Sequence, residues 1–258
     1  MKSILALLSL SVLSYAEVVM PGGGVIAHIA DGGGITMNIT VVNLDDTANT
    51  WQLIMYADSG ALLPIATDVG TLNTFGGTLA PHGSFTIHTL GAGATATQGW
   101  AWLITSGTIG GSVVFKVNAA PWSGSETMLP LDTWKNNRFS LVFDHTGTNT
   151  TGLAMANPSS TTAIAVTVTF KDQSGAVIVT KSFSMPPFTH TTSVATNDFP
   201  LTNGKTGTVE ISTTGASMGV LGLRFGPTAV SSILPLVSNS WVPATNPNPN
   251  PMPNPYPY

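Results

Sequence analysis

The feature that most constrains this chain is an internal repeat of roughly 105 residues, which is the length of one small domain and too long for a solenoid unit. The matching stretches are residues 35–60 and 149–175, 99–107 and 207–215, 113–116 and 222–225, and the closing phrases MLPL at 128–131 and ILPL at 233–236. The repeat predicts two related domains in tandem, over residues 24–132 and 138–237, joined by a short linker around Thr133–Asn137.

Both copies consist of short apolar segments that alternate in period two and are separated by turn residues. The segments are residues 35–42, 51–57, 84–89, 100–105, 112–117, 163–171, 176–183, 208–212 and 220–225. They are rich in Thr, Val, Ile and Phe, and no segment shows helical periodicity. This pattern predicts an all-β chain of two tandem Ig-like antiparallel β-sandwiches, each of roughly seven strands.

The first sixteen residues have the pattern of a secretory signal peptide. Lys2 supplies a positive start, Ile4–Leu13 forms a short apolar core, and Ser14–Ala16 offers small residues for cleavage after Ala16. We therefore expect the protein to be secreted, or to reside in a periplasm or cell envelope.

Composition narrows the compartment and the partners. The chain contains no cysteine, so it cannot carry a disulfide or a Cys-linked lipid anchor, and this favours a bacterial export route. Only 8% of the residues are charged, the net charge is −4, and no Lys/Arg cluster is present, which argues against nucleic acid as a partner. No later apolar run is long enough to predict a membrane span.

The last residues, Pro243–Tyr258, read PATNPNPNPMPNPYPY. Proline at every second or third position removes backbone donors and fixes φ, which excludes a helix or a central strand. We expect a disordered or polyproline-like tail, either inert or acting as a spacer or docking segment.

Four stretches of the second copy resemble a family of secreted tandem β-sandwich repeat proteins of soil bacteria. They are GLAMANP at 152–158, TVTFKDQSG at 167–175, GKTGTVEI at 204–211 and VLGLRFGP at 220–227. The resemblance extends over roughly residues 28–237 and is stronger in the second copy. It implies the sandwich architecture and export. The family has no settled activity, so the resemblance implies no catalytic residues.

Motifs that suggest catalysis lack the context they need. Gly215–Gly219 matches the G-x-S-x-G nucleophile pattern, but no Asp, Glu or His follows it, so we predict a hairpin turn. Gly204-Lys205-Thr206 lacks the rest of a phosphate-binding loop and is also predicted to be a turn. His82 and His88 are a weak pairing for zinc.

A polar loop and two asparagines are further candidates for a functional or a structural role. The loop from Asp144 to Asn149 holds several oxygen donors, so it is either a calcium site or a turn in which these side chains cap backbone donors. Asn43 and Asn157 end equivalent strands, and we predict that both bond to turn backbone. We predict no catalytic, cofactor-binding or metal-binding residue.

Comparison of the two copies predicts an apolar outer face on the first domain. Pairing Gly99 with Gly207 sets Trp100 and Trp102 against polar residues of the second copy, whereas their neighbours match the core positions of that copy. Because strand neighbours alternate between faces, both tryptophans are predicted to lie on the outer face.

A second strand supports the same conclusion. Pairing Asp58 with Asp172 matches Trp51, Leu53 and Met55 with positions of the second copy that are predicted to face outward. An apolar patch of this kind usually marks an interaction surface. The alternative is that the second domain, the linker or the N-terminal segment covers it.

These observations favour a non-catalytic secreted protein with a binding or structural role in adhesion, an envelope or a matrix. Its predicted ligand-binding residues are Trp51, Leu53, Met55, Trp100 and Trp102, facing a protein, a glycan or a second copy. The alternative is a carbohydrate-binding module that uses the tryptophans as platforms. A hydrolase is less expected, because glycosidases need two opposed carboxylates and most acidic residues here lie in turns.

Overall fold

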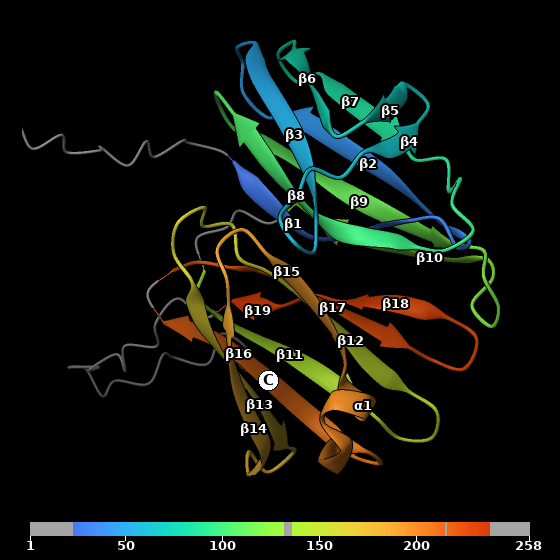
Figure 1. The fold of residues 1–258 in the computed structure, drawn as a ribbon, viewed down its shortest axis with the longest axis vertical. Helices are drawn as coiled ribbons and strands as arrows, with labels where there is room; N and C mark the ends of the chain where they lie inside the picture. Colours follow the sequence, from blue (N-terminus) through green and yellow to red (C-terminus); the bar gives the residue numbers. More distant parts are fainter. Residues whose placement is uncertain (1–22, 132–135, 215, 238–258) are drawn as a thin grey trace, which may run out of the picture.

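The computed structural model describes residues 23–131, 136–214 and 216–237, and this part is built almost entirely of antiparallel strands (Figure 1). Its helices are one four-residue helix, α1 (Ala195–Asp198), and one 3-10 turn, η1 (Pro200–Thr202). None of the described helices is long and apolar enough to span a membrane. The predicted signal peptide, most of the predicted linker and the proline-rich tail lie outside the described residues.

The N-terminal half, residues 24–130, forms two four-stranded sheets and a hairpin. One sheet has the order β1-β8-β3-β6: β1 (Gly24–Asp31), β8 (Thr97–Thr105), β3 (Asn49–Ala57) and β6 (Thr74–Leu79). The other has the order β10-β9-β2-β7: β10 (Ser125–Pro130), β9 (Ile109–Val117), β2 (Ile35–Asn43) and β7 (Ser84–His88). The hairpin consists of β4 (Ile65–Thr67) and β5 (Gly70–Leu72).

The C-terminal half, residues 138–237, also forms two sheets. One has the order β14-β13-β16-β11-β19: β14 (Val177–Met185), β13 (Ile164–Asp172), β16 (Thr206–Thr214), β11 (Arg138–Asp144) and β19 (Leu236–Val237). The other has the order β15-β12-β17-β18: β15 (His190–Val194), β12 (Thr150–Ala156), β17 (Gly219–Phe225) and β18 (Val230–Ile233).

The two halves have matching strand orders. Numbered from the start of each half, β1-β8-β3-β6 corresponds to β11-β16-β13-β14, and β10-β9-β2-β7 corresponds to β18-β17-β12-β15. Among the described strands, the β4–β5 hairpin and β19 have no counterpart in the other half, and no strand pairs across the halves. The prediction of an all-β chain is confirmed, and each of the nine predicted segments overlaps a strand.

Each half has its own apolar core, formed by alternate residues of its two sheets. Ile39 and Val41 of β2 belong to the first core, and Leu141 of β11 and Val168 of β13 belong to the second. The first core continues across the boundary, because it includes Ala154 and Leu221 of the C-terminal half. Burial of these apolar side chains is the main favourable contribution to folding.

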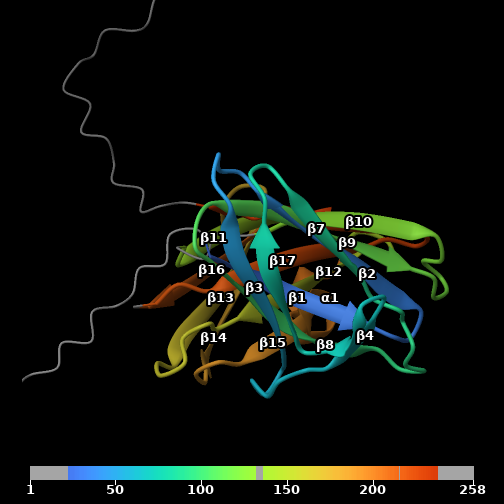
Figure 2. The ribbon, with the colours of Figure 1, turned by 90° about the horizontal axis from the view of Figure 1, so that it is seen from above.

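The halves are stacked one on the other, as the overlap of their strands in the view from above shows (Figure 2). The strands that meet are β1 and β10 on one side and β12, β17 and β18 on the other, with β8 near β15 (Figure 1). The outer face of the sheet β15-β12-β17-β18 is therefore turned toward the N-terminal half.

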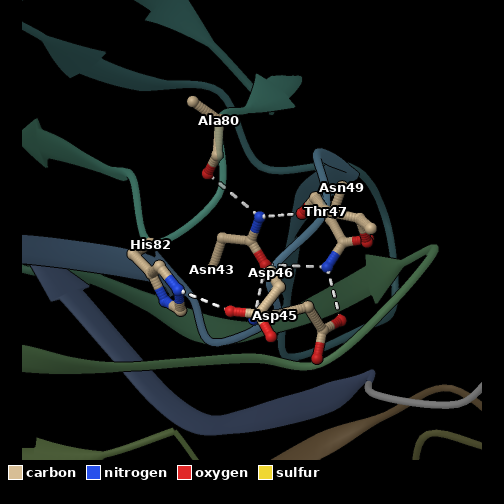
Figure 3. Close-up of polar contacts among 7 residues, drawn as sticks. All are labelled: Asn43, Asp45, Asp46, Thr47, Asn49, Ala80 and His82. Atoms are coloured by element: carbon tan, nitrogen blue, oxygen red, sulfur yellow. Dashed lines mark hydrogen bonds and ion pairs between the residues drawn. The ribbon is translucent and has the colours of Figure 1, made fainter.

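A buried asparagine side chain ties the two sheets of the N-terminal half together at one end. The Nδ2 of Asn43, at the end of β2, donates to the carbonyl oxygens of Thr47 and Ala80 at 2.7 and 3.0 Å (Figure 3). Its Oδ1 accepts the backbone N–H of Asp45 at 3.1 Å. Since β2 and β6 belong to different sheets, these bonds fix the end of one sheet against the other.

Asn157, which follows β12, makes the same bonds in the C-terminal half. Its Nδ2 donates to the carbonyl oxygens of Thr162 and Pro186, both at 2.9 Å, and its Oδ1 accepts the backbone N–H of Ser159 at 3.1 Å. Both asparagines are 0% exposed. The prediction that Asn43 and Asn157 bond to turn backbone is confirmed.

We predict that Asn157→Ala lowers the free energy of unfolding by about 3 kcal/mol, because it leaves buried carbonyl groups without a donor. Urea denaturation followed by circular dichroism would measure the change. Asn118→Ala is the control, since Asn118 is exposed, and it should change stability by less than about 0.5 kcal/mol. Equal stability of the two variants would contradict a role of Asn157 in holding the sheets.

Candidate functional site

Trp100 and Trp102 lie on the face of β8 that points away from the N-terminal core, as predicted. Their neighbours Ala101 and Leu103 are core residues. Trp100 is nevertheless 0% exposed, because its ring contacts Tyr56 of β3 at 4.9 Å between centroids and Phe188 of the C-terminal half at the same distance. The aromatic face therefore exists, but it is covered by the other half of the chain.

The predicted outward direction of Trp51, Leu53 and Met55 is wrong. The three side chains are 5%, 0% and 0% exposed and belong to the core of the N-terminal half. Trp51 also contacts Phe85 of β7, in the facing sheet, at 5.5 Å. These residues do not form an accessible binding surface in this structure.

The error comes from a one-residue slip in the comparison of the two copies. Gly99 of β8 pairs with Ala57, whereas its counterpart Gly207 of β16 pairs with Asp172. Ala57 is thus equivalent to Asp172, although the similar turns suggested pairing Asp58 with Asp172. Because strand side chains alternate, a slip of one residue moves every side chain to the opposite face.

Close backbone contact explains why glycine stands at both of these positions. A Cβ added to Gly99 would overlap the carbonyl oxygen of Tyr56, and one added to Gly207 would overlap that of Lys171. The two glycines allow β8 and β16 to approach the neighbouring strand at the same point.

Phe188, in the loop between β14 and β15, is the residue that covers the aromatic face. Its φ is +60°, and its ring meets Trp102 at 5.8 Å and Tyr56 at 4.4 Å, edge-on in both cases. A Cβ on Gly60 would overlap the carbonyl oxygen of Phe188, so glycine lets the loop approach. Edge-to-face packing of aromatic rings adds to the burial energy.

A line of polar side chains continues the interface beside the aromatic cluster. Nδ1 of His190 lies 2.8 Å from Oδ1 of Asp58, and Nε2 of His190 lies 3.4 Å from Nδ1 of His28 in β1. Gln98 of β8 donates to Oδ2 of Asp58 at 3.0 Å. The backbone N–H of His190 also donates to the carbonyl oxygen of Asp58 at 3.0 Å, so these contacts join the two halves.

Burial keeps both histidines neutral near pH 7. Burial, together with the neighbouring His190, lowers the pKa of His28 to about 3, and the Asp58 carboxylate offsets only part of this effect. Burial also lowers the pKa of His190, although its hydrogen bond to Asp58 acts in the opposite direction. The contact between His190 and Asp58 is therefore a hydrogen bond from a neutral imidazole to a carboxylate.

Sequence reasoning did not identify Phe188, His28, His190 or Gln98. No motif or spacing links them, because they come from β1, β8 and the segment around β15 and meet only when the halves stack. The indole N–H of Trp100 is buried and has no acceptor among the described residues. Nothing in the structure explains this unpaired donor, which carries a cost of about 1–3 kcal/mol.

Acidic side chains near the other turns have structural partners. Oδ2 of Asp45 accepts from the Nδ2 of Asn49 and the backbone N–H of Thr108, both at 2.7 Å, and these bonds lower the pKa of Asp45. Asp46 contacts Nε2 of His82 at 3.0 Å (Figure 3). Both pairs brace the loop that follows β2.

The Asp144 loop has the geometry of the capped turn. Oδ1 of Asp144 accepts the N–H and O–H of Thr146, and Oδ2 accepts from Asn149 at 3.0 Å and from the guanidinium of Arg224 at 3.1 Å. The bonds from Thr146, with the pairing to Arg224, lower the pKa of Asp144 to about 2. The capping interpretation is supported, because the Asp144 carboxylate is already paired with the guanidinium of Arg224.

The remaining motif residues lie apart from one another. His82 bonds to Asp46, whereas His88 bonds to Asn38 at 2.8 Å. In the described part of the chain, no group of three or more His, Cys, Asp and Glu side chains could hold a metal ion. Gly204 lies in the turn before β16, as predicted. Ser217 lies in the connection between β16 and β17, and the predicted hairpin is wrong there, because these two strands belong to different sheets and do not pair.

Comparison with known proteins adds no relative to this picture: no family model matches the chain, and no functionally curated protein matches its sequence.

We predict that Phe188→Ala lowers the free energy of unfolding by about 2 kcal/mol, because it uncovers the rings of Trp100 and Trp102. The tryptophan emission of the folded variant should shift to longer wavelength. Phe183→Ala on the edge strand β14 is the matched control, since Phe183 is 37% exposed, and it should leave the emission unchanged. An unshifted spectrum for Phe188→Ala would show that this ring does not cover the tryptophans.

Stability should fall as pH decreases below about 6.5, before the carboxylates titrate. The pKa of His28 is about 3 in the folded chain against 6.5 as its ordinary value, so the unfolded chain binds more protons between these values. Each unit of pH in that window then removes up to about 1.4 kcal/mol. Urea midpoints at pH 8, 6 and 4 test this, and His28→Gln should flatten the decline.

Proposed function

We propose that the protein is an exported, non-catalytic binding or structural protein built from two Ig-like β-sandwich domains that arose by duplication. The matching strand orders of the two halves and the equivalent bonds of Asn43 and Asn157 support the duplication. Export rests on the signal-peptide pattern of residues 1–16 and on the resemblance to secreted tandem repeat proteins.

The observation that carries the non-catalytic role is the use of the acidic side chains. Every carboxylate among the described residues accepts a hydrogen bond or pairs with a cation. Most of these partners lie in the same turn or on the adjacent strand. A hydrolase needs two carboxylates that face each other across a substrate cleft, whereas these carboxylates are engaged in turns, strand pairs and, for Asp58, the contact between the halves.

We place the proposed interaction surface away from the tryptophans, because Trp51 and Trp100 are buried. The β4–β5 hairpin is an insertion of the N-terminal half, and loops of this kind often carry binding residues. Large apolar side chains on or beside it are exposed: Leu62 by 53%, Val69 by 49%, Leu72 by 43% and Leu90 by 58%. The carbohydrate-binding alternative would also need another surface, because Trp51 and Trp100 are buried.

A second copy of the chain is the partner to test first, because a surface with few charges resists association poorly. Expressed with residues 1–16 in a bacterial host, the exported protein should begin at Glu17 by mass spectrometry. Recovery only from the cytoplasm, with residues 1–16 attached, would contradict export.

We predict that the purified exported protein associates with increasing concentration and that the variant Leu62→Ser/Leu72→Ser/Leu90→Ser stays monomeric. Sedimentation velocity measures both. Val177→Ser is the control, since Val177 is 61% exposed on β14, and it should associate like the wild type. Association of the triple variant would place the surface elsewhere, and hydrolysis of a chromogenic glycoside by wild-type protein would contradict the non-catalytic role.

A further inference from the structure

A pocket of about 180 Å³ lies between the two halves, beside the histidine pair. Its floor is the outer face of the sheet formed by β15, β12 and β17, and its opposite wall comes from His28 of β1 and Gln98 of β8. It is a half-open cavity that forms only because the halves are stacked, and none of the proposed binding roles above uses it.

Small residues on β12 create the space. Gly152 and Ala154 lie on the face turned to the N-terminal half, flanked by Leu223 and Leu221 of β17. A Cβ on Gly152 would come within 2.6 Å of the Phe225 ring, so glycine allows this ring to close the end of the pocket. These side chains give the pocket an apolar floor.

The polar side of the pocket has a defined hydrogen-bond pattern. The oxygens of a carboxylate carry no hydrogen and can only accept, so the proton of His190 lies on Nδ1, which faces Oδ1 of Asp58, while Oδ2 accepts from Gln98. Nε2 of the neutral His190 is then an acceptor, and Nδ1 of His28 must be the donor to it. The remaining nitrogen, Nε2 of His28, therefore carries a lone pair.

The arrangement of the two rings agrees with this hydrogen bond. Their planes differ by 25° and their centroids are 5.4 Å apart, while the two nitrogens are separated by 3.4 Å. Because the two nitrogens lie about 2 Å closer together than the centroids, the offset rings approach each other through the edges that carry these nitrogens. Nε2 of His28 has no hydrogen-bond partner among the described residues.

Thr192 supplies the complementary group. Its Oγ1 accepts from Nε2 of Gln98 at 3.4 Å, so its own hydrogen remains free to donate. His28, with this lone pair, and Thr192, with this hydroxyl, both line the pocket next to its apolar floor. A ligand hydroxyl satisfies both, because it donates one hydrogen and accepts another.

We propose that this pocket binds a small, largely apolar molecule that carries a hydroxyl group, of the size of phenol. The hydroxyl donates to Nε2 of His28 and accepts from Oγ1 of Thr192, and the ring packs against Ala154 and Leu223. The volume suits a single ring, since a cavity of about 150 Å³ is enough for benzene. The proposal is independent of the partner that the β4–β5 hairpin binds.

Titration of the exported protein with phenol at pH 7.5, followed by amide chemical shifts, tests the proposal. We expect saturable shifts at Gly152, Ala154 and Leu223. Fluorobenzene, which has nearly the same shape but no donor, should bind about three- to tenfold more weakly, as expected for the loss of one or two neutral hydrogen bonds. This comparison leaves the protein unchanged, so it does not depend on the folding of a variant.

Thr192→Val keeps the shape of the side chain and should weaken phenol about threefold while leaving fluorobenzene unchanged. Val177→Thr, on the exposed edge strand, is the matched control and should bind phenol like the wild type. The proposal is overturned by a lack of saturable binding, by equal affinity for phenol and fluorobenzene, or by shifts that map to residues outside this pocket.

Discussion

A buried asparagine amide holds the two sheets together at the same end of each half, and the positions of the other elements depend on it. Asn43 and Asn157 reach from one sheet to backbone carbonyls at the end of a strand in the other. The chain has no cysteine and few charges, so neither disulfides nor ion-pair networks can provide this connection. Several neutral hydrogen bonds in a dry environment replace them, and they also fix the loops that follow β2 and β12.

The second constraint is the apolar outer face of β8. Its exposure to water would be energetically unfavourable if the N-terminal half stood alone. The chain covers it with its own Phe188, and the same contact brings His28, His190 and Asp58 into one line. The stacking of the halves therefore does two things at once: it buries the tryptophans and it creates a pocket with a polar side. An apolar surface that suggests an external partner is here an intramolecular interface.

Much of the fold follows from local patterns. Period-two alternation located strands in both halves. The placement of Trp100 and Trp102 opposite the core was correct because Gly99 and Gly207 occupy matching positions in the strand orders of the two halves. The predicted outward direction of Trp51 was wrong because the two copies were compared with a shift of one residue. Turns tolerate an inserted residue, so the similarity of two turns is a poor guide to the register of the strands beside them. Hydrogen bonding to the neighbouring strand, by contrast, permits only one register. The histidine pair and Phe188 carried no local signal at all.

The sequence by itself determined the all-β architecture and the structural use of Asn43 and Asn157, because alternation and turn chemistry act between residues close along the chain. Only the tertiary structure decided which apolar faces remain exposed. Whether Trp100 meets water or Phe188 depends on residues 88 positions apart, and on the glycine at position 60 that admits the loop. Burial is a property of the surfaces that finally meet, and alternation within one strand contains no information about what will cover its outer face.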